Sequence, residues 1–134
     1  MSGLAEALSG RRGPGVYRWE STWTPERVRE PVEHAGWRFA HLEGTRIETA
    51  LDLHEALEEA LVLPDHYGRN LDALADVMRS MAGHQVLLYD TWSVLARADE
   101  YVFTTACRLL GERIVLLLRG DGPDLPGFVV EVLD

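Results

Sequence analysis

The chain has 134 residues, 46% of them hydrophobic, which suits one globular domain with a core of its own. Its formal net charge of −9 disfavours direct binding to nucleic-acid phosphates and suits a basic protein partner. No apolar run approaches the length of a membrane span, and the first ten residues lack the features of a secretory signal. We therefore expect a cytoplasmic protein with no membrane partner.

The first third of the chain contains two predicted helices and two predicted strands. The helices cover 2–9 and 24–36, and the strands cover 16–19 and 37–42. Thr24 and Pro25 are a typical helix start, and Pro31 weakens the same helix. We expect residues 1–36 to form an N-terminal extension that packs on or beside the core, and residues 37–134 to form the main domain.

Strands and helices alternate in the rest of the chain. After a turn over 43–45, helices are predicted over 49–62 and 68–81, one or two helices over 92–111, inner strands over 85–89 and 113–118, and an edge strand over 128–132. The two inner strands are nearly continuous apolar runs, as in parallel sheets that are covered on both faces. The predicted fold class is α/β, with a three-stranded parallel sheet packed against helices and room for extra edge strands.

Few residues fall into a catalytic or metal-binding pattern. His54 and Glu55 are not followed by a second histidine at the spacing of zinc proteases, and the glycine-rich stretch 11–15 lacks the lysine that ends a phosphate loop. The lone Cys107 is interpreted as a buried structural residue rather than as a catalytic thiol. We expect no metal, no cofactor and no enzymatic activity, and an enzyme with an unrecognised site remains a further hypothesis.

The segment 63–76 carries the strongest pattern. In its predicted helix, Leu74 and Met78 face one side while Asp72 and Asp76 face the other, one turn apart. Between residues 50 and 76, seven acidic residues and one arginine give a net charge of −6. Such a face is either a solvated helix surface or a receptor for a basic partner. Asn70 is expected to cap the helix through its side chain.

This segment resembles the signature of the barstar family, which reads Leu-Pro-x-x-Tyr-Gly-x-Asn-Leu-Asp-Ala-Leu-x-Asp, and the likeness extends over about 37–119. The resemblance implies an intracellular inhibitor of a bacterial ribonuclease or toxin nuclease domain. It implies that the helix and the preceding loop block the nuclease active site. Asp76 then faces the catalytic basic residues, with Asp72 beside it, in place of the RNA phosphates.

The partner-binding residues implied by the resemblance belong to the loop and the helix after it. They are His66, Tyr67, Gly68, Asn70, Asp72, Ala75, Asp76 and Arg79. The rings of His66 and Tyr67 are expected to lie beside the acids. The sequence departs from the family pattern at His66, which replaces an aromatic residue, at Ala75, which replaces a tryptophan, and at Arg69, which replaces an acid. These departures motivate a second hypothesis, a non-inhibitory adaptor or regulatory module on the same fold.

Overall fold

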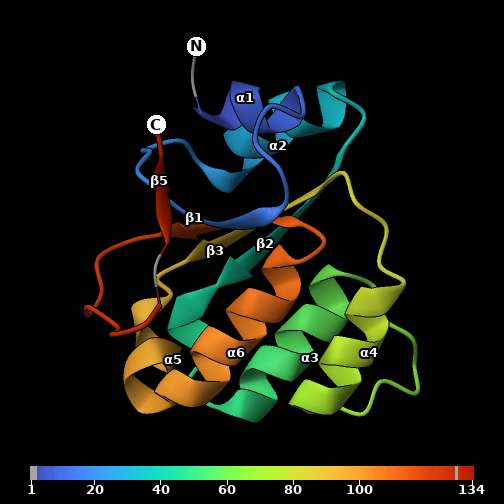
Figure 1. Cartoon of the computed structure of the whole chain (residues 1–134), viewed down its shortest axis with the longest axis vertical. Helices are drawn as coiled ribbons and strands as arrows, with labels where there is room; N and C mark the ends of the chain where they lie inside the picture. The colour runs from blue at the N-terminus through green and yellow to red at the C-terminus, as the bar shows by residue number, and fades with distance from the viewer. Residues whose placement is uncertain (1–2, 129) are drawn as a thin grey trace.

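A five-stranded parallel sheet separates two layers of helices in the computed structural model of the chain, which describes residues 3–128 and 130–134 (Figure 1). The strands are β1 (Gly15–Trp19), β2 (Arg38–Glu43), β3 (Gln85–Asp90), β4 (Val115–Arg119) and β5 (Glu131–Leu133). Their order in the sheet is β2-β3-β4-β1-β5, and every pair is parallel. Helices α1 (Gly3–Leu8) and α2 (Pro25–His34) cover one face, and helices α3 (Ala50–Ala60), α4 (Leu71–Arg79), α5 (Ser93–Ala98) and α6 (Glu100–Gly111) cover the other.

The α/β class and the parallel sheet are confirmed, but the sheet has five strands instead of the expected three. β1, which comes from the first 36 residues, lies inside the sheet, where Tyr17 is in register with Leu117 of β4 and with Glu131 of β5. The predicted edge strand 128–132 corresponds to β5, which occupies the sheet edge beyond β1. Val129 and Ser2, which the sequence assigned to this strand and to the first helix, lie outside the described residues.

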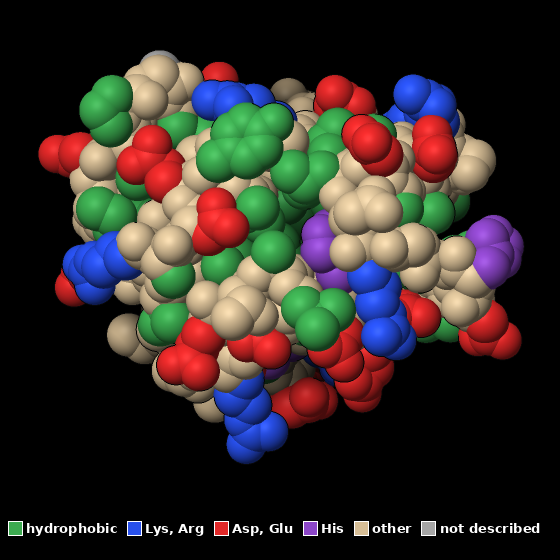
Figure 2. All heavy atoms as spheres, turned by 90° about the horizontal axis from the view of Figure 1, so that it is seen from below, with side chains coloured by type: hydrophobic (Ala, Val, Ile, Leu, Met, Phe, Trp, Pro, Cys, Tyr) green, Lys and Arg blue, Asp and Glu red, His purple; other side chains and the backbone are tan. Residues whose placement is uncertain are grey.

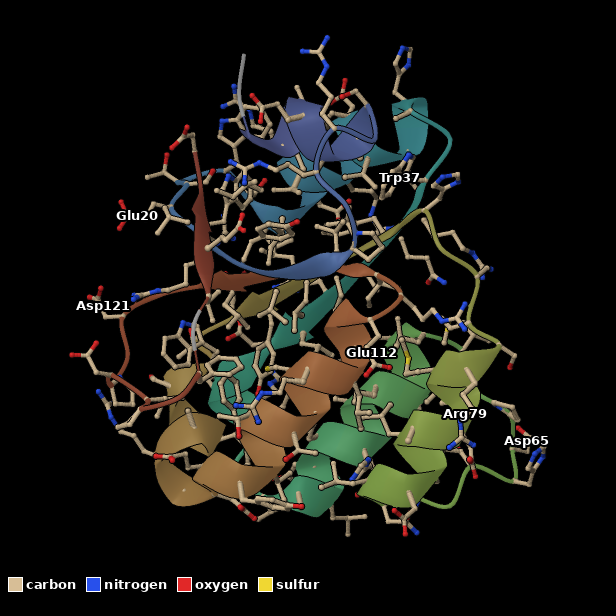
Figure 3. All side chains as sticks on the ribbon, viewed as in Figure 1. Glu20, Trp37, Asp65, Arg79, Glu112 and Asp121 are labelled. Carbon is tan, nitrogen blue, oxygen red and sulfur yellow. The ribbon has the colours of Figure 1, made fainter. Side chains whose placement is uncertain are left out.

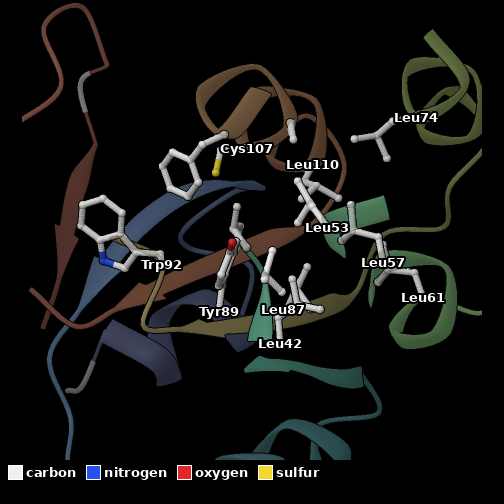
Figure 4. Close-up of a cluster of buried hydrophobic side chains, with 14 of the residues drawn as sticks. Leu42, Leu53, Leu57, Leu61, Leu74, Leu87, Tyr89, Trp92, Cys107 and Leu110 are labelled. Carbon is white, nitrogen blue, oxygen red and sulfur yellow. The ribbon is translucent and has the colours of Figure 1, made fainter. Parts of the chain in front are cut away.

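Two apolar clusters hold the layers together, one on each face of the sheet. The larger cluster joins leucines of α3, α4 and α6 to β2, β3 and β4 (Figure 4). Its labelled members include Leu42, Leu57, Leu74, Leu87 and Leu110, each at most 2% exposed. The smaller cluster packs α1 and α2 against the opposite face of the strands. Because both faces are covered, β3 and β4 are apolar along nearly their whole length.

Side-chain caps decide where most of the helices begin. Thr24 accepts a hydrogen bond from the N–H of Arg27 at the start of α2. Thr49 and Asp52 form a reciprocal capping box at the start of α3. The predicted turn at 43–45 is a short 3-10 helix, η1 (Gly44–Arg46), and the predicted helical stretch 92–111 divides at Asp99, which caps α6. No helix among the described residues combines the length and the apolar character that crossing a bilayer requires.

Candidate partner-binding surface

Helix α4 presents its polar residues on one face because its apolar residues are committed to the core. Leu74 and Met78 are fully buried, whereas Asp72 and Asp76 are exposed and Ala75 is half-buried between them. Asn70 caps the helix as expected, since its Oδ1 accepts the N–H of Ala73 at 2.8 Å. The first turn of α4 therefore carries a carboxylate at a helix N-terminus, where negative charge is favourable.

Arg79 lies one turn after Asp76 and pairs with it. Its Nη1 donates to Oδ1 of Asp76 at 2.5 Å, and both side chains are about 70% exposed. Figure 3 shows Arg79 and Asp65 projecting from the same side of the molecule. Because the pair is exposed, water screens the attraction between the two charges. Asp76 and Arg79 can therefore each leave the other and pair with a charge on another molecule. A basic ligand that approaches Asp76 competes with Arg79.

The loop 62–70 before α4 is anchored by two buried side chains. Leu63 and Tyr67 are 7% and 6% exposed, and the residues between them, which include His66, are exposed. The hydroxyl of Tyr67 lies 2.6 Å from Nδ1 of the buried His54 on α3. The expectation that the Tyr67 ring lies on the surface beside the acids is therefore wrong, because that ring forms part of the core. Of the two rings, only that of His66 is available at the surface.

Burial also fixes the protonation states of this pair. It lowers the pKa of His54 below its ordinary value, so the imidazole is neutral at pH 7. Burial, assisted by the nearby charge of Glu58, raises the pKa of Tyr67 to about 12. A neutral histidine and a protonated tyrosine form a stable hydrogen bond that ties the loop to α3.

Gly68, Arg69 and Asn70 shape the end of the loop. A Cβ at Gly68 would lie 3.2 Å from the Cβ of Ala73, so glycine lets the loop pass close to α4. Arg69 has a φ of 53° and donates from Nε to Glu58 at 2.8 Å. The amide of Asn70 donates to the carbonyl of Gly68. Gly68 and Asn70 thus set the position of the loop and the helix, while His66, Asp72, Asp76 and Arg79 supply exposed side chains.

The acidic segment is divided between two surfaces in the folded chain. Asp65, Asp72 and Asp76 belong to the loop and α4, whereas Asp52, Glu55 and Glu59 line a groove beside β2. Figure 2, which views the molecule from the side of α3 to α6, shows carboxylates in several groups with arginines between them. The charge of −6 over 50–76 therefore does not act as one patch.

Sequence reasoning missed a half-buried ionic cluster at the carboxyl end of the sheet, formed by Asp90, Arg119 and His41. Asp90, at the end of β3, accepts two hydrogen bonds from Arg119 and lies 2.8 Å from Nε2 of His41. Burial raises the pKa of Asp90, but the hydrogen bonds from Arg119 and His41 outweigh it and hold the pKa below its ordinary value. The sequence did contain a sign of this cluster, because a charged residue directly follows each of the two apolar runs: Asp90 in β3 and Arg119 in β4.

This cluster lies at the carboxyl ends of the strands, where parallel α/β folds commonly bind ligands, and Arg119 also lines a cavity of about 350 Å³ there. Nη1 of Arg119 donates to the carbonyls of Ser21 and Trp23 in the loop after β1. That loop turns carbonyl oxygens inward, whereas a phosphate-binding loop presents N–H groups. Within residues 3–128 and 130–134, no group of three or more His, Cys, Asp or Glu side chains has the arrangement of a metal site.

Cys107 lies in the larger core cluster, as its structural interpretation requires. It is 1% exposed, and burial raises the pKa of its thiol well above the ordinary value. A thiol that stays protonated is a poor nucleophile.

Residues 37–115 match the model of the family described as Barstar (barnase inhibitor). The matched range covers more than half of the chain and contains β2, β3, the loop 62–70 and helices α3 to α6. It leaves out α1, β1 and α2, which come before it. It also leaves out β5 and all of β4 except its first residue, which come after it.

Two solved structures have a similar fold over most of this chain. A chain in the structure of Drosophila ORC bound to DNA matches with a TM-score of 0.64 and 18% identity over 96% of this chain. The Aeropyrum pernix ORC2 protein, in ADPNP–ADP complexes, matches with a TM-score of 0.57 and 16% identity over 89% of this chain. The matches span 40% and 38% of those longer chains. At these identities the likeness concerns the fold alone, and it includes the parts of the sheet outside the family match.

Proposed function

The chain belongs to the barstar (barnase inhibitor) family, and on that premise we propose that it is an intracellular protein inhibitor of a ribonuclease. The partner is a secreted bacterial ribonuclease or a toxin nuclease domain. The chain acts by binding and not by catalysis. The observation that carries the proposal is the retained family signature, whose two helix acids, Asp72 and Asp76, are exposed on α4.

The geometry of α4 supports inhibition by charge mimicry. A ribonuclease active site is lined by basic groups that bind the phosphates of RNA, and carboxylates on a rigid helix can replace those phosphates. Asp76 and Asp72 lie one turn apart, and Leu74 and Met78 fix the helix on the core. Because the cap and the core contacts hold the helix, little conformational entropy is lost when the two acids dock.

The anchored loop supports the same role. His66 and Asp65 project from a loop that Leu63 and Tyr67 tie to the core. A fixed loop beside an acidic helix forms a surface that can enter the mouth of an active site. The half-buried Ala75 on α4 is much smaller than the tryptophan that the family pattern carries at that place. The partner therefore needs a complementary protrusion at that place.

The test is an RNA-cleavage assay with the ribonucleases and toxin nuclease domains encoded in the same genome. The wild-type chain is expected to abolish cleavage by one of them at a one-to-one ratio. The D72N/D76N double variant keeps the exposed helix and is expected to lose inhibition. If the chain neither inhibits nor binds any of these nucleases, the proposal is wrong.

A second candidate function is a non-inhibitory module that binds another protein through the same fold. The Asp76–Arg79 pair favours it, since this pair partly neutralises the acid that inhibition relies on. A stable complex with a non-nuclease protein, insensitive to D72N/D76N, would support this candidate over the first.

A further inference from the structure

The edge strand β2 leaves half of its backbone groups without a strand partner. It is the last strand in the sheet order and pairs only with β3. The N–H of Arg38 donates to the carbonyl of His84, which places the polar backbone groups of Arg38 on the β3 side. Because consecutive residues of a strand alternate in direction, the N–H and C=O groups of Phe39, His41 and Glu43 face the open edge.

A groove of about 540 Å³ runs along this open edge. All of 39–43 lines it, together with Arg29 of α2 on one side and a row of α3 residues on the other. The Arg29 guanidinium lies 5.0 Å from the centre of the Phe39 ring and covers it. On the α3 side, the small side chains of Ala56 and Ala60 leave room for another main chain. The groove is therefore open to an extended segment along the whole of β2.

The free charge in the groove is mainly negative and lies on α3. Glu55 is exposed, as is Glu59 one turn later, and neither forms an ion pair within the part of the chain that the structure describes. Asp52 is engaged in the capping box, and Arg29 is shared between two glutamates of α2. Arg46 adds one positive charge to the lining. The wall that faces an incoming strand thus favours lysine or arginine.

We propose that β2 binds an extended basic segment of a partner protein as a sixth strand of the sheet. The backbone of the segment pairs with Phe39, His41 and Glu43, over about 20 Å for six residues. Alternate lysine or arginine side chains of the segment face Glu55 and Glu59. The side chains between them face Phe39 and the stem of Arg29, and are apolar.

This site is independent of the proposed inhibition of a nuclease, because it shares no residue with the loop 62–70 or α4. A second copy of the chain fits the edge less well. Edge-to-edge pairing of two copies brings together two acidic α3 walls, on chains that each carry a net charge of −9.

The test uses a blocked eight-residue peptide that alternates lysine and valine, added to the full chain. Backbone amide exchange of Phe39, His41 and Glu43 is expected to slow, and NMR shifts are expected to concentrate on β2 and α3. Two further peptides carry N-methyl groups, one on every lysine and the other on every valine. In an added strand, the N–H groups of every second residue face β2. The peptide whose methyl groups replace the hydrogens of those N–H groups is expected to bind more than tenfold more weakly, and the other peptide is expected to bind as the parent does.

Variants of the protein test the charge. E55Q/E59Q is expected to weaken binding of the parent peptide by about three- to tenfold, as for two exposed ion pairs. D72N/D76N, the matched control on α4, is expected to leave binding unchanged. The proposal is overturned if both N-methylated peptides bind like the parent, if the three β2 amides keep their exchange rates, or if the chain forms dimers through β2. None of these results bears on inhibition of a nuclease.

Discussion

Replacement of Tyr67 by phenylalanine tests whether its hydrogen bond to His54 holds the loop 62–70 in place. The substitution keeps the ring in the core but leaves Nδ1 of His54, a residue 2% exposed, without its partner. A buried polar group without a partner costs about 1–3 kcal/mol. For a chain of this length, that loss lowers Tm by roughly 3–12 °C. Thermal and urea unfolding followed by circular dichroism measures it.

Tyr89 provides a matched control in the same core. Its hydroxyl is buried and has no hydrogen-bond partner among the described residues. Replacement of Tyr89 by phenylalanine removes an unsatisfied group, so the free energy of unfolding is expected to stay the same or to rise by about 1 kcal/mol. The same chemical change at two buried tyrosines is thus expected to have opposite effects.

Hydrogen exchange distinguishes the loop from the rest of the fold. In the Tyr67→Phe variant, the amides of Leu63 and Tyr67, which donate to the carbonyls of Glu58 and Pro64, are expected to exchange faster relative to those in β3 and β4, because the loop has lost a tie to α3. Equal destabilisation by both tyrosine substitutions, or unchanged exchange in the loop, would refute the argument that this hydrogen bond anchors the loop.

Four further predictions concern single residues. In the proposed complex, Asp76→Ala removes one partner of a buried charge pair and is expected to weaken binding to the nuclease by about 2–5 kcal/mol. An inhibition constant within threefold of the wild-type value, measured by titration, would contradict this prediction. Arg79→Ala removes the cation that competes for Asp76, so stopped-flow association with the nuclease is expected to be faster at low salt, with a smaller difference at high salt. Because burial lowers the pKa of His54 below 6.5, its contribution to stability is complete above pH 6.5 and decreases as the unfolded chain takes up protons below it. In urea titrations between pH 7 and 5, the free energy of unfolding is expected to decrease less with falling pH for His54→Gln than for wild type. Thr49→Ala removes one half of a capping box and is expected to lower the free energy of unfolding by about 0.5–2 kcal/mol, and an unchanged urea midpoint would count against the cap.

Local features of the fold could be predicted from the sequence because they depend on neighbouring residues. The Asn70 cap, the Thr24–Pro25 helix start and the apolar stripe of α4 each involve residues within one or two turns. The family signature is also local, since it spans a loop and one helix. These features were enough to predict the α/β class and an exposed acidic face on α4.

Contacts between distant residues were decided only by the tertiary structure. The position of β1 between β4 and β5 depends on pairing between residues about 100 positions apart, such as Gly15 and Val115. A five-residue strand has a periodicity that does not specify its partners, so its sequence predicted a strand without a place in the sheet.

The two proposed binding surfaces show the same division. Spacing predicted that Asp72 and Asp76 share a face, because a helix fixes the direction of side chains four residues apart. Whether Tyr67 is exposed, and which acids of 50–76 belong together, depends on how α3 packs against β2 and the loop. Burial of Tyr67 against His54, and the turning of Glu55 and Glu59 towards β2, result from that packing and from the apolar area it removes from water.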